Sequence, residues 1–241
     1  MNKILGIIAE YNPFHNGHKY QLQKAKKETN SKYTIAIMGG NFTQRGSISL
    51  INKWDKTKLA LLGGIDLVLE LPLMYSISSA ENFAEGAIKL LNSLKIVDYL
   101  SFGAETSDIN TLNTISDILY SEPNNFKLLI NQELKKGLSF PKARENALVS
   151  YLNNPNVSKI VASPNNILGI EYLKALKKCK SSIKPHLVQR IGSDYNDKNI
   201  TNTFSSSTAI REAISSKNYS SLKGTVEEFL KMLKKVLKKD Q

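Results

Sequence analysis

Short apolar runs alternate with helix-like patterns along the first hundred residues. The runs predict strands at 3–9, 33–38, 66–71 and 97–102, each closed by a glycine, a proline or a polar turn. Apolar spacing predicts helices between them at about 17–29, 53–62 and 78–93, the second with Trp54, Lys58, Leu61 and Leu62 at helical intervals. Because strands and helices alternate with short connections, we expect an α/β fold with helices on both faces of a parallel sheet.

The pattern changes after the fourth predicted strand. Residues 109–153 predict successive helices interrupted at Pro123 and Pro141, which we interpret as a helical insertion. A helix from about Pro164 to Lys178, a strand at 185–190 and a Ser-capped helix at about 206–215 then complete a nucleotide-binding type of domain over 1–215. The C-terminal part, residues 216–241, predicts a basic amphipathic helix over 224–239. Such a helix packs on its own core in most proteins, and contact with a membrane surface or RNA is the alternative.

Composition narrows the class of protein. Hydrophobic residues make up 41% of the 241 residues and charged residues 22%, which is typical of a soluble globular chain. No apolar run approaches the roughly 18 residues that a membrane span needs, and the run before Glu10 has no cleavage site of a signal peptide. The single cysteine, Cys179, excludes a disulfide framework and a cysteine-based zinc site. We therefore expect a cytoplasmic protein that contacts no membrane.

The chain carries a formal net charge of +12, from 33 Lys+Arg against 21 Asp+Glu. Such a charge favours a polyanionic partner, with nucleic acid as the first candidate. A lysine-rich surface that reflects an AT-rich genome explains the charge equally well, since Asn and Ile are abundant too. The charge therefore limits the partners without choosing one.

The motif His15-Asn16-Gly17-His18 follows the first predicted strand and opens the first predicted helix. Unpaired backbone N–H groups at a helix N-terminus attract phosphate, and Gly17 would let the backbone come close. Two imidazoles there, His15 and His18, can donate to phosphate oxygens as charge develops. Two histidines that simply cap a helix are the alternative. A metal site is not expected, because no third ligand completes the set.

A second cluster, Ser205-Ser206-Ser207-Thr208-Ala209-Ile210-Arg211, opens the predicted helix near the end of the chain. Ser and Thr are good N-caps, so a capped surface helix is one interpretation. The other is a second phosphate cradle, in which Ser206, Ser207 and Thr208 hold phosphates and Arg211 neutralises charge on the leaving group. The pair of motifs resembles the signature of the HxGH nucleotidyltransferase superfamily, whose Rossmann-like nucleotidyltransferase fold brings both helix starts to one ATP.

Longer segments resemble the bacterial tRNA(Met) cytidine acetate ligase family over about residues 3–215. They are Ile8 to His18, Met38 to Gly46, Lys53-Trp54, Asp66 to Pro72, Phe102 to Glu105, Pro164 to Gly169 and Gln189-Arg190. The resemblance implies an enzyme that activates acetate with ATP as acetyl-adenylate, with Mg²⁺ accompanying the ATP. The acetyl group then passes to N4 of the wobble cytidine in elongator tRNA(Met).

The resemblance also implies site residues. The ATP-binding segment is Ile8, Ala9, Glu10, Tyr11, Asn12, Pro13, Phe14, His15, Asn16, Gly17, His18, Lys19, Tyr20 and Gln21. Gly103, Asn165 and Arg190 are the further ATP contacts, against a plain N-cap for Asn165 and a solvated surface side chain for Arg190 as alternatives. From charge and position, we place Gln44, Arg45 and Lys53 near the acetate and the α-phosphate.

Two other functions stay open from the sequence. One is an adenylyltransferase that acts on a small phosphate-bearing cofactor precursor, and the other is a non-catalytic RNA-binding module. Members of the family usually continue for well over a hundred residues past the second motif, with a C-terminal domain that helps to hold tRNA. Since this chain ends at Gln241, we expect that domain to be absent from it.

Overall fold

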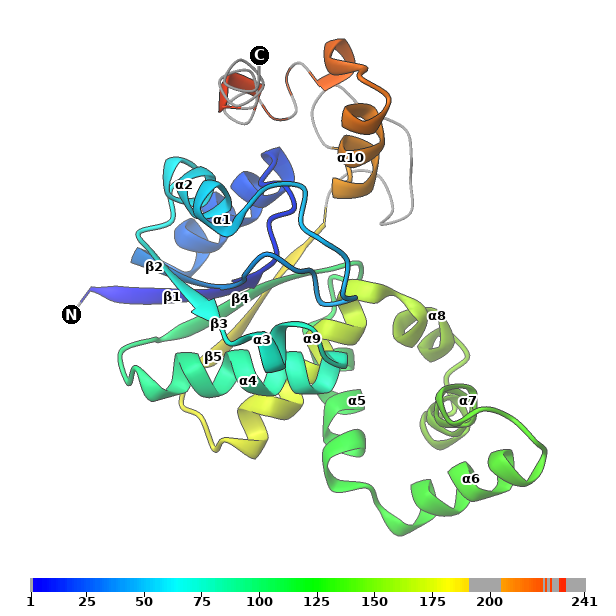
Figure 1. Ribbon diagram of the computed structural model, residues 1–241. Coiled ribbons are helices and arrows are strands. Elements are labelled where there is room, and N and C mark those ends of the chain that lie inside the picture. Colours follow the sequence, from blue (N-terminus) through cyan, green and yellow to red (C-terminus); the bar gives the residue numbers. More distant parts are fainter. Residues whose placement is uncertain (1, 191–204, 223, 225, 227–229, 233–241) are drawn as a thin grey trace.

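A parallel sheet forms the centre of the molecule (Figure 1). The computed structural model describes residues 2–190, 205–222, 224, 226 and 230–232. Within these residues the sheet has five strands in the order β3-β2-β1-β4-β5, and every neighbouring pair is parallel. The strands are β1 (Lys3–Ala9), β2 (Ser31–Gly39), β3 (Leu67–Leu71), β4 (Tyr99–Ala104) and β5 (Lys184–Gln189). All five predicted strands are therefore confirmed.

The central strand β1 is apolar on both faces because helices cover both. Leu5 and Ile7 pack into one apolar cluster, whereas Ile8 packs into the other. Successive side chains of a strand point to opposite faces, so the run KILGIIA supplies both layers of the core at once. This arrangement explains why the first strand shows no alternation of polar and apolar residues.

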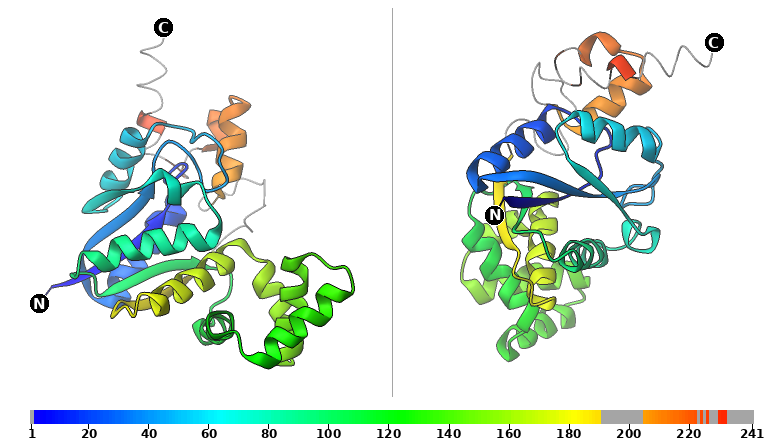
Figure 2. Two further views of the ribbon diagram at one scale, coloured as in Figure 1. Left: turned by 60° about the horizontal axis from the view of Figure 1, so that its bottom comes forward. Right: turned by 90° about the vertical axis from the view of Figure 1, so that its left-hand side faces the viewer.

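Helices form a layer on each face of the sheet (Figure 2). Helices α1 (Asn16–Thr29) and α2 (Lys53–Leu62) lie on one face, where Leu22, Ala25 and Ala60 meet residues of β1 and β2. Helices α4 (Ala80–Ser93) and α9 (Pro164–Lys178) lie on the other, with Ile88 and Leu173 in its core. The predicted two-layered coverage is thus confirmed.

The predicted helix at 53–62 is present, but it buries a different face from the one that its large apolar residues suggest. Trp54 is 75% exposed and Leu62 59% exposed, whereas Lys56, Leu59 and Ala60 are buried. Leu59 contacts the C-terminal part of the chain, in a cluster with Ile210, Ala213, Leu222 and Val226. The helix therefore uses its small apolar face to hold the second motif in place.

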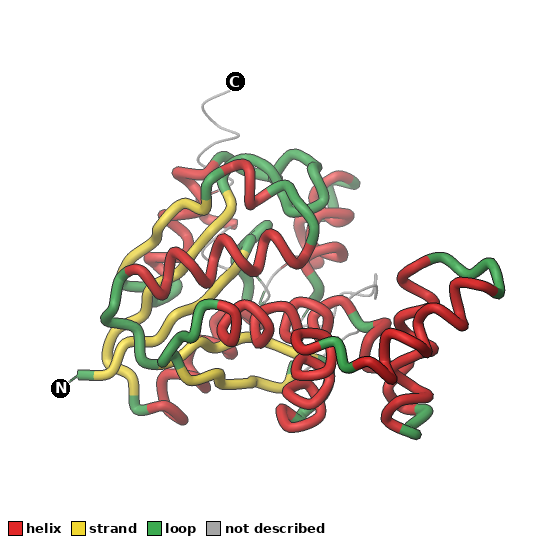
Figure 3. The backbone as a smooth tube through the Cα atoms, turned by 90° about the horizontal axis from the view of Figure 1, so that it is seen from below, coloured by secondary structure: helices red, strands yellow, loops and turns green. Residues whose placement is uncertain are grey.

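Four helices between β4 and α9 form an arm beside the sheet (Figure 3). They are α5 (Ile109–Ser121), α6 (Asn124–Lys135), α7 (Phe140–Leu152) and α8 (Asn156–Ala162). Pro123 directly precedes α6, and Pro141 lies in the first turn of α7. Proline is tolerated there because the first N–H groups of a helix have no intrahelical partner. The two prolines therefore mark helix starts in the predicted insertion.

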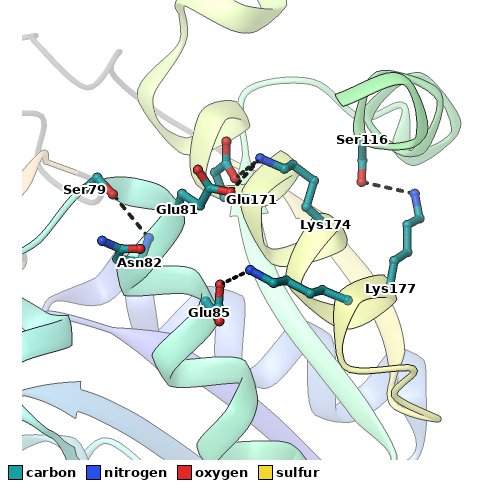
Figure 4. A network of polar contacts seen from close by, with 9 residues as sticks. Ser79, Glu81, Asn82, Glu85, Ser116, Glu171, Lys174 and Lys177 are labelled. Atoms are coloured by element: carbon teal, nitrogen blue, oxygen red, sulfur yellow. Dashed lines mark hydrogen bonds and ion pairs between the residues drawn. The ribbon is translucent and has the colours of Figure 1, made fainter. Parts of the chain in front are cut away.

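Lysines of α9 tie this helix to its neighbours (Figure 4). Lys174 Nζ lies 3.3 Å from a carboxylate oxygen of Glu81 on α4 and 2.8 Å from one of Glu171. Lys177 donates to the hydroxyl of Ser116 on α5 at 3.1 Å.

The short helix α3 (Leu73–Ser76), which the sequence analysis did not predict, packs against α4. A Cβ on Gly86 of α4 would lie 2.3 Å from the Tyr75 ring of α3. Gly86 therefore permits this close packing.

The C-terminal part is described through α10 (Ser207–Ser215), the 3₁₀ turn Tyr219–Leu222 and a few later residues. Val226 is buried and Leu230 half-buried against the cluster of Leu59 and Ile210. Most of the amphipathic helix predicted at 224–239 lies outside the described residues. Among the helices that are described, none combines the length and the apolar character needed to cross a membrane.

Candidate nucleotide site

The two sequence motifs meet between β1 and β4, where the strand order of the sheet reverses. Strands β1 and β4 are neighbours, yet the connection after β1 crosses one face of the sheet and the connection that leads to β4 crosses the other. In open α/β sheets a crevice forms at the carboxyl ends of two such strands, and ligands bind there. Here the loop Glu10–His15 follows β1, and Gly103 lies near the end of β4.

His15 and His18 cap the N-terminus of α1 reciprocally. His15 Nδ1 accepts the N–H of Gly17 at 3.1 Å, and His18 Nδ1 accepts the N–H of His15 at 3.3 Å. The two rings stack with centroids 3.8 Å apart. Because Nδ1 is the acceptor in both neutral rings, the ring proton of each lies on Nε2. The caps therefore fix which nitrogen of each histidine is a donor.

Direct hydrogen bonds join the two motifs. His15 Nε2 lies 3.1 Å from the hydroxyl oxygen of Ser207, a residue 192 positions away in the sequence. Arg211 donates to the carbonyl oxygen of Asn12 at 2.9 Å and to the hydroxyl of Thr208 at 3.0 Å. With its proton on Nε2, His15 donates to Ser207. The N-termini of α1 and α10 are thus held side by side.

A cleft that encloses about 460 Å³, including the space open to solvent, lies beside this junction. It is lined by residues of both motifs and of the ends of β4 and β5: His15, Gly17, His18, Tyr20, Gln21, Gly103, Val188, Gln189, Arg190, Ser205 and Ser206. The structure thus brings eight of the predicted site residues together. Val188, Gln189 and Ser205 line the cleft but were not predicted as site residues. Gln189 and Ser205 are next in sequence to the predicted Arg190 and Ser206, and this adjacency could have identified them.

Burial and positive charge hold both histidines in the neutral form. The pKa of His15 is lowered to about 3, first by desolvation and then by the cations of Arg190 and Arg211. The pKa of His18 is lowered well below its ordinary value by desolvation, by His15 and by Arg190. Within the described residues, no group accepts a hydrogen bond from His18 Nε2, whereas that of His15 is engaged by Ser207. His18 is therefore the imidazole with a donor left for a ligand.

Gly17 is required by the cap itself. A Cβ at this position would lie 2.9 Å from His15 Cε1 and 3.1 Å from His15 Nδ1, which is too close for the stacked ring. The sequence analysis explained Gly17 by the approach of phosphate alone. The structure adds a second reason, because the capping imidazole occupies the space of a side chain.

Other residues of the predicted ATP segment do not line the cleft. Ile8 and Tyr11 are buried in the core, and Asn12 is buried with its side-chain oxygen on the N–H of Leu50 at 2.7 Å. Since the carbonyl of Asn12 also accepts from Arg211, this residue connects the loop after β2 to α10. Ala9, Glu10, Pro13, Phe14, Asn16 and Lys19 likewise do not line the cleft.

Asn165 lies at the N-terminus of α9 and binds Glu105. Its side-chain amide donates to Glu105 Oε1 at 2.6 Å, and the N–H of Asn166 donates to Oε2 at 2.9 Å. The buried Asn166 returns the contact by accepting the N–H of Glu105 at 2.9 Å. Glu105 therefore caps α9 just beyond β4. Neither Asn165 nor Glu105 lines the cleft, so the ATP contact of Asn165 stays a prediction.

Gln44, Arg45 and Lys53 also lie outside the cleft lining, on the segment between β2 and the start of α2. The N–H of Gln44 binds the carboxylate of Glu10, and Lys53 pairs with Glu70 at 2.7 Å. Arg45 is exposed. Their placement near acetate stays a prediction.

The sequence analysis missed Lys56, a cation with 1% of its surface exposed. It donates to the carbonyl of Gly39 at 3.0 Å and to the hydroxyl of Ser49 at 3.2 Å, and burial lowers its pKa. Lys56 therefore pins the loop that carries Gln44 to the end of β2. Its spacing with Leu59 and Ala60 on one helical face was the signal that could have found it.

We predict that acid weakens the fold through His15. The ring is neutral in the folded chain but takes up a proton below about pH 6.5 when unfolded. Stability is therefore full above that pH and declines as pH falls toward the folded pKa, by about 2 kcal/mol at pH 5 from this residue. Urea titrations at pH 7 and pH 5 measure the loss. His15→Asn, which keeps a capping acceptor, should lose clearly less; an equal loss in both proteins contradicts the assignment.

Comparison with known proteins shows which proteins the chain is similar to. The tRNA(Met) cytidine acetate ligase of Acetivibrio thermocellus is 51% identical over 220 residues, 91% of this chain and 53% of the ligase. The ligase of Caldanaerobacter subterraneus is 49% identical over 238 residues, 98% of this chain and 59% of the ligase. The chain thus spans a little over half the length of these relatives.

A solved structure shares the fold described above. Thermotoga maritima TmcAL, in a crystal structure with alpha-thio ATP bound, matches with a TM-score of 0.89 at 37% identity, over 98% of this chain and 56% of that one. The sequence model of the HIGH nucleotidyl transferases matches residues 2–241. This chain, with two helix N-termini joined beside one cleft, therefore belongs to the HIGH nucleotidyl transferase family.

Proposed function

We propose that this chain carries the ATP-dependent chemistry of a tRNA(Met) cytidine acetate ligase. The observation that carries the proposal is the junction of the two motifs, where His15 Nε2 lies 3.1 Å from the hydroxyl oxygen of Ser207. The cleft beside this junction is lined by Arg190, His18 and Ser206. Relatives with this name are about half identical to the chain, and TmcAL binds an ATP analogue.

The first step joins acetate to AMP. A carboxylate oxygen of acetate attacks the α-phosphorus of ATP, the bond from that phosphorus to the bridging oxygen breaks, and pyrophosphate leaves with the electron pair. Such a transfer depends mainly on positioning and on stabilising the negative charge that moves onto the leaving group. The cleft offers Arg190 and the N-termini of α1 and α10, while Arg211 supplies positive charge behind the second motif.

His18 acts in this step as a neutral donor. Its Nδ1 is held by the N–H of His15, so its Nε2–H is left to donate to a phosphate oxygen as charge develops. His15 has a positioning role, because its own donor is used on Ser207. The lowered pKa of both rings keeps them neutral, and the arginines supply the positive charge.

The second step passes the acetyl group to RNA. The N4 amine of the wobble cytidine in elongator tRNA(Met) attacks the acetyl carbonyl, AMP leaves, and the amine loses a proton. Gln44, Arg45 and Lys53 are proposed to lie near acetate and the α-phosphate, on the segment that Lys56 pins to β2. The net charge of +12 supports a polyanionic substrate.

Mg²⁺ would accompany the ATP and neutralise phosphate charge. In the described part of the chain, no group of three or more His, Cys, Asp and Glu side chains is arranged to hold a metal ion. Mg²⁺ commonly keeps waters and binds through substrate phosphates, so the residues present fit an ion carried by ATP.

Exchange of radioactive pyrophosphate into ATP tests the proposed activation. We expect exchange with acetate, weaker exchange with longer carboxylates, and acetylated cytidine when tRNA(Met) is added. Nicotinamide mononucleotide and phosphopantetheine are the matched controls. Exchange with either of these but not with acetate would establish an adenylyltransferase instead, and salt-dependent tRNA binding without any ATP turnover would establish an RNA-binding module.

A second prediction isolates the donor of His18. His18→Asn keeps an acceptor near the position of Nδ1 for the helix cap but removes the Nε2–H. We expect the rate of acetate-dependent exchange to fall about 10²–10³-fold, with ATP affinity changed much less, because a donor to developing charge acts in the transition state. His186→Asn, in β5 outside the cleft lining, is the control. A His18→Asn protein that is slowed less than tenfold contradicts this role.

A further inference from the structure

A second cavity lies where the helical arm meets the body of the domain. It has a volume of about 310 Å³, which lies at the lower end of the size range of small-molecule sites. Helices α5, α7, α8 and α9 all contribute to its lining, and it shares no lining residue with the nucleotide cleft. Nothing in the proposed reaction uses it.

Five aliphatic side chains form one part of the wall. They are Leu119, Leu148, Val161, Ile167 and Ile170, of which Leu148 and Ile170 are fully buried. No aromatic residue takes part in the lining. An aliphatic group fits such a wall, whereas a nucleobase would find no ring to stack on.

Each carboxylate of the cavity already has a lysine partner, and one of these lysines, Lys174, is shared between Glu171 and Glu81. Glu171 pairs with Lys174 at 2.8 Å, and Figure 4 shows its carboxylate turned toward that lysine. Glu145 pairs with Lys142 at 2.7 Å and also accepts from the hydroxyl of Ser158. Both carboxylates thus contact lysines, and neither forms an ion pair with Arg144.

Arg144 is the exception among the charged groups. This residue is half-buried at the cavity, and in the part of the chain that the structure describes no side chain or carbonyl pairs with it. The planar guanidinium suits a carboxylate, which it can bind through two parallel hydrogen bonds. The cavity therefore combines an aliphatic wall with one arginine that has no ion-pair partner among the described residues.

We propose that this cavity binds an aliphatic monocarboxylate, with the carboxylate on Arg144 and the chain against Leu148 and Ile170. The site is separate from the nucleotide cleft and does not depend on the proposed function. A single arginine matches a single negative charge, and the wall matches a chain of several carbons. Acetate alone would leave the wall uncovered.

Calorimetric titration with hexanoate tests the proposal, with saturating α,β-methylene ATP, which no carboxylate can convert to an adenylate, present to occupy the nucleotide cleft. Hexanoate should bind at least tenfold more tightly than acetate, which lacks the aliphatic tail. It should also bind at least tenfold more tightly than hexan-1-ol, which lacks the negative charge. Arg144→Met should weaken hexanoate about tenfold or more, since a charge-assisted pair is lost. Lys142→Met, which removes a cation already paired with Glu145, should change the affinity less than about threefold.

A direct measurement covers the case in which Arg144→Met fails to fold. Crystals of the unaltered chain soaked with 6-bromohexanoate should show anomalous bromine density among Leu119, Leu148 and Ile170. Hexan-1-ol binding as tightly as hexanoate, an unchanged affinity in a folded Arg144→Met protein, or bromine density only in the nucleotide cleft would each overturn the proposal.

Discussion

The contact between His15 and Ser207 is the interaction on which the nucleotide site depends. It joins a turn that follows the first strand to a helix that begins 192 residues later, and the pairing of Arg211 with the carbonyl of Asn12 reinforces it. These hydrogen bonds add a direct polar link between the two helix N-termini to the apolar packing of α10 against Leu59. Held together, the two N-termini create one cleft in which several N–H groups and hydroxyls can face the same chain of phosphates.

The same contact divides the work between the two histidines. Reciprocal capping places the ring proton of each on Nε2, and Ser207 then engages the donor of His15. Burial together with Arg190 and Arg211 keeps both rings neutral. The positive charge of the site thus comes from arginine, which stays charged at any working pH, while an imidazole supplies a directed hydrogen bond. The proposed chemistry needs both, because ATP is highly charged and the leaving group gains further charge.

The sequence predicted the parts of this structure that local patterns encode. The five strands, the main helices and the meeting of the two motifs followed from apolar runs, helix-start residues and a motif pair of known geometry. The buried face of α2 did not, since Trp54 and Leu62 are large and apolar yet exposed. That face is decided by α10, far away in the sequence. For the same reason the burial of Lys56 and the binding of Asn165 to Glu105 were visible only in three dimensions.

A double-mutant cycle on ATP binding tests the central claim most directly. It uses His15→Ala, Ser207→Ala and the double variant, with affinities measured by calorimetry. If the contact holds the two helix N-termini to one nucleotide, each single change weakens binding and the double change is little worse than the more harmful single one, with a coupling of about 0.5–3 kcal/mol. Losses that simply add would contradict the account, because His15 and Ser207 would then act independently.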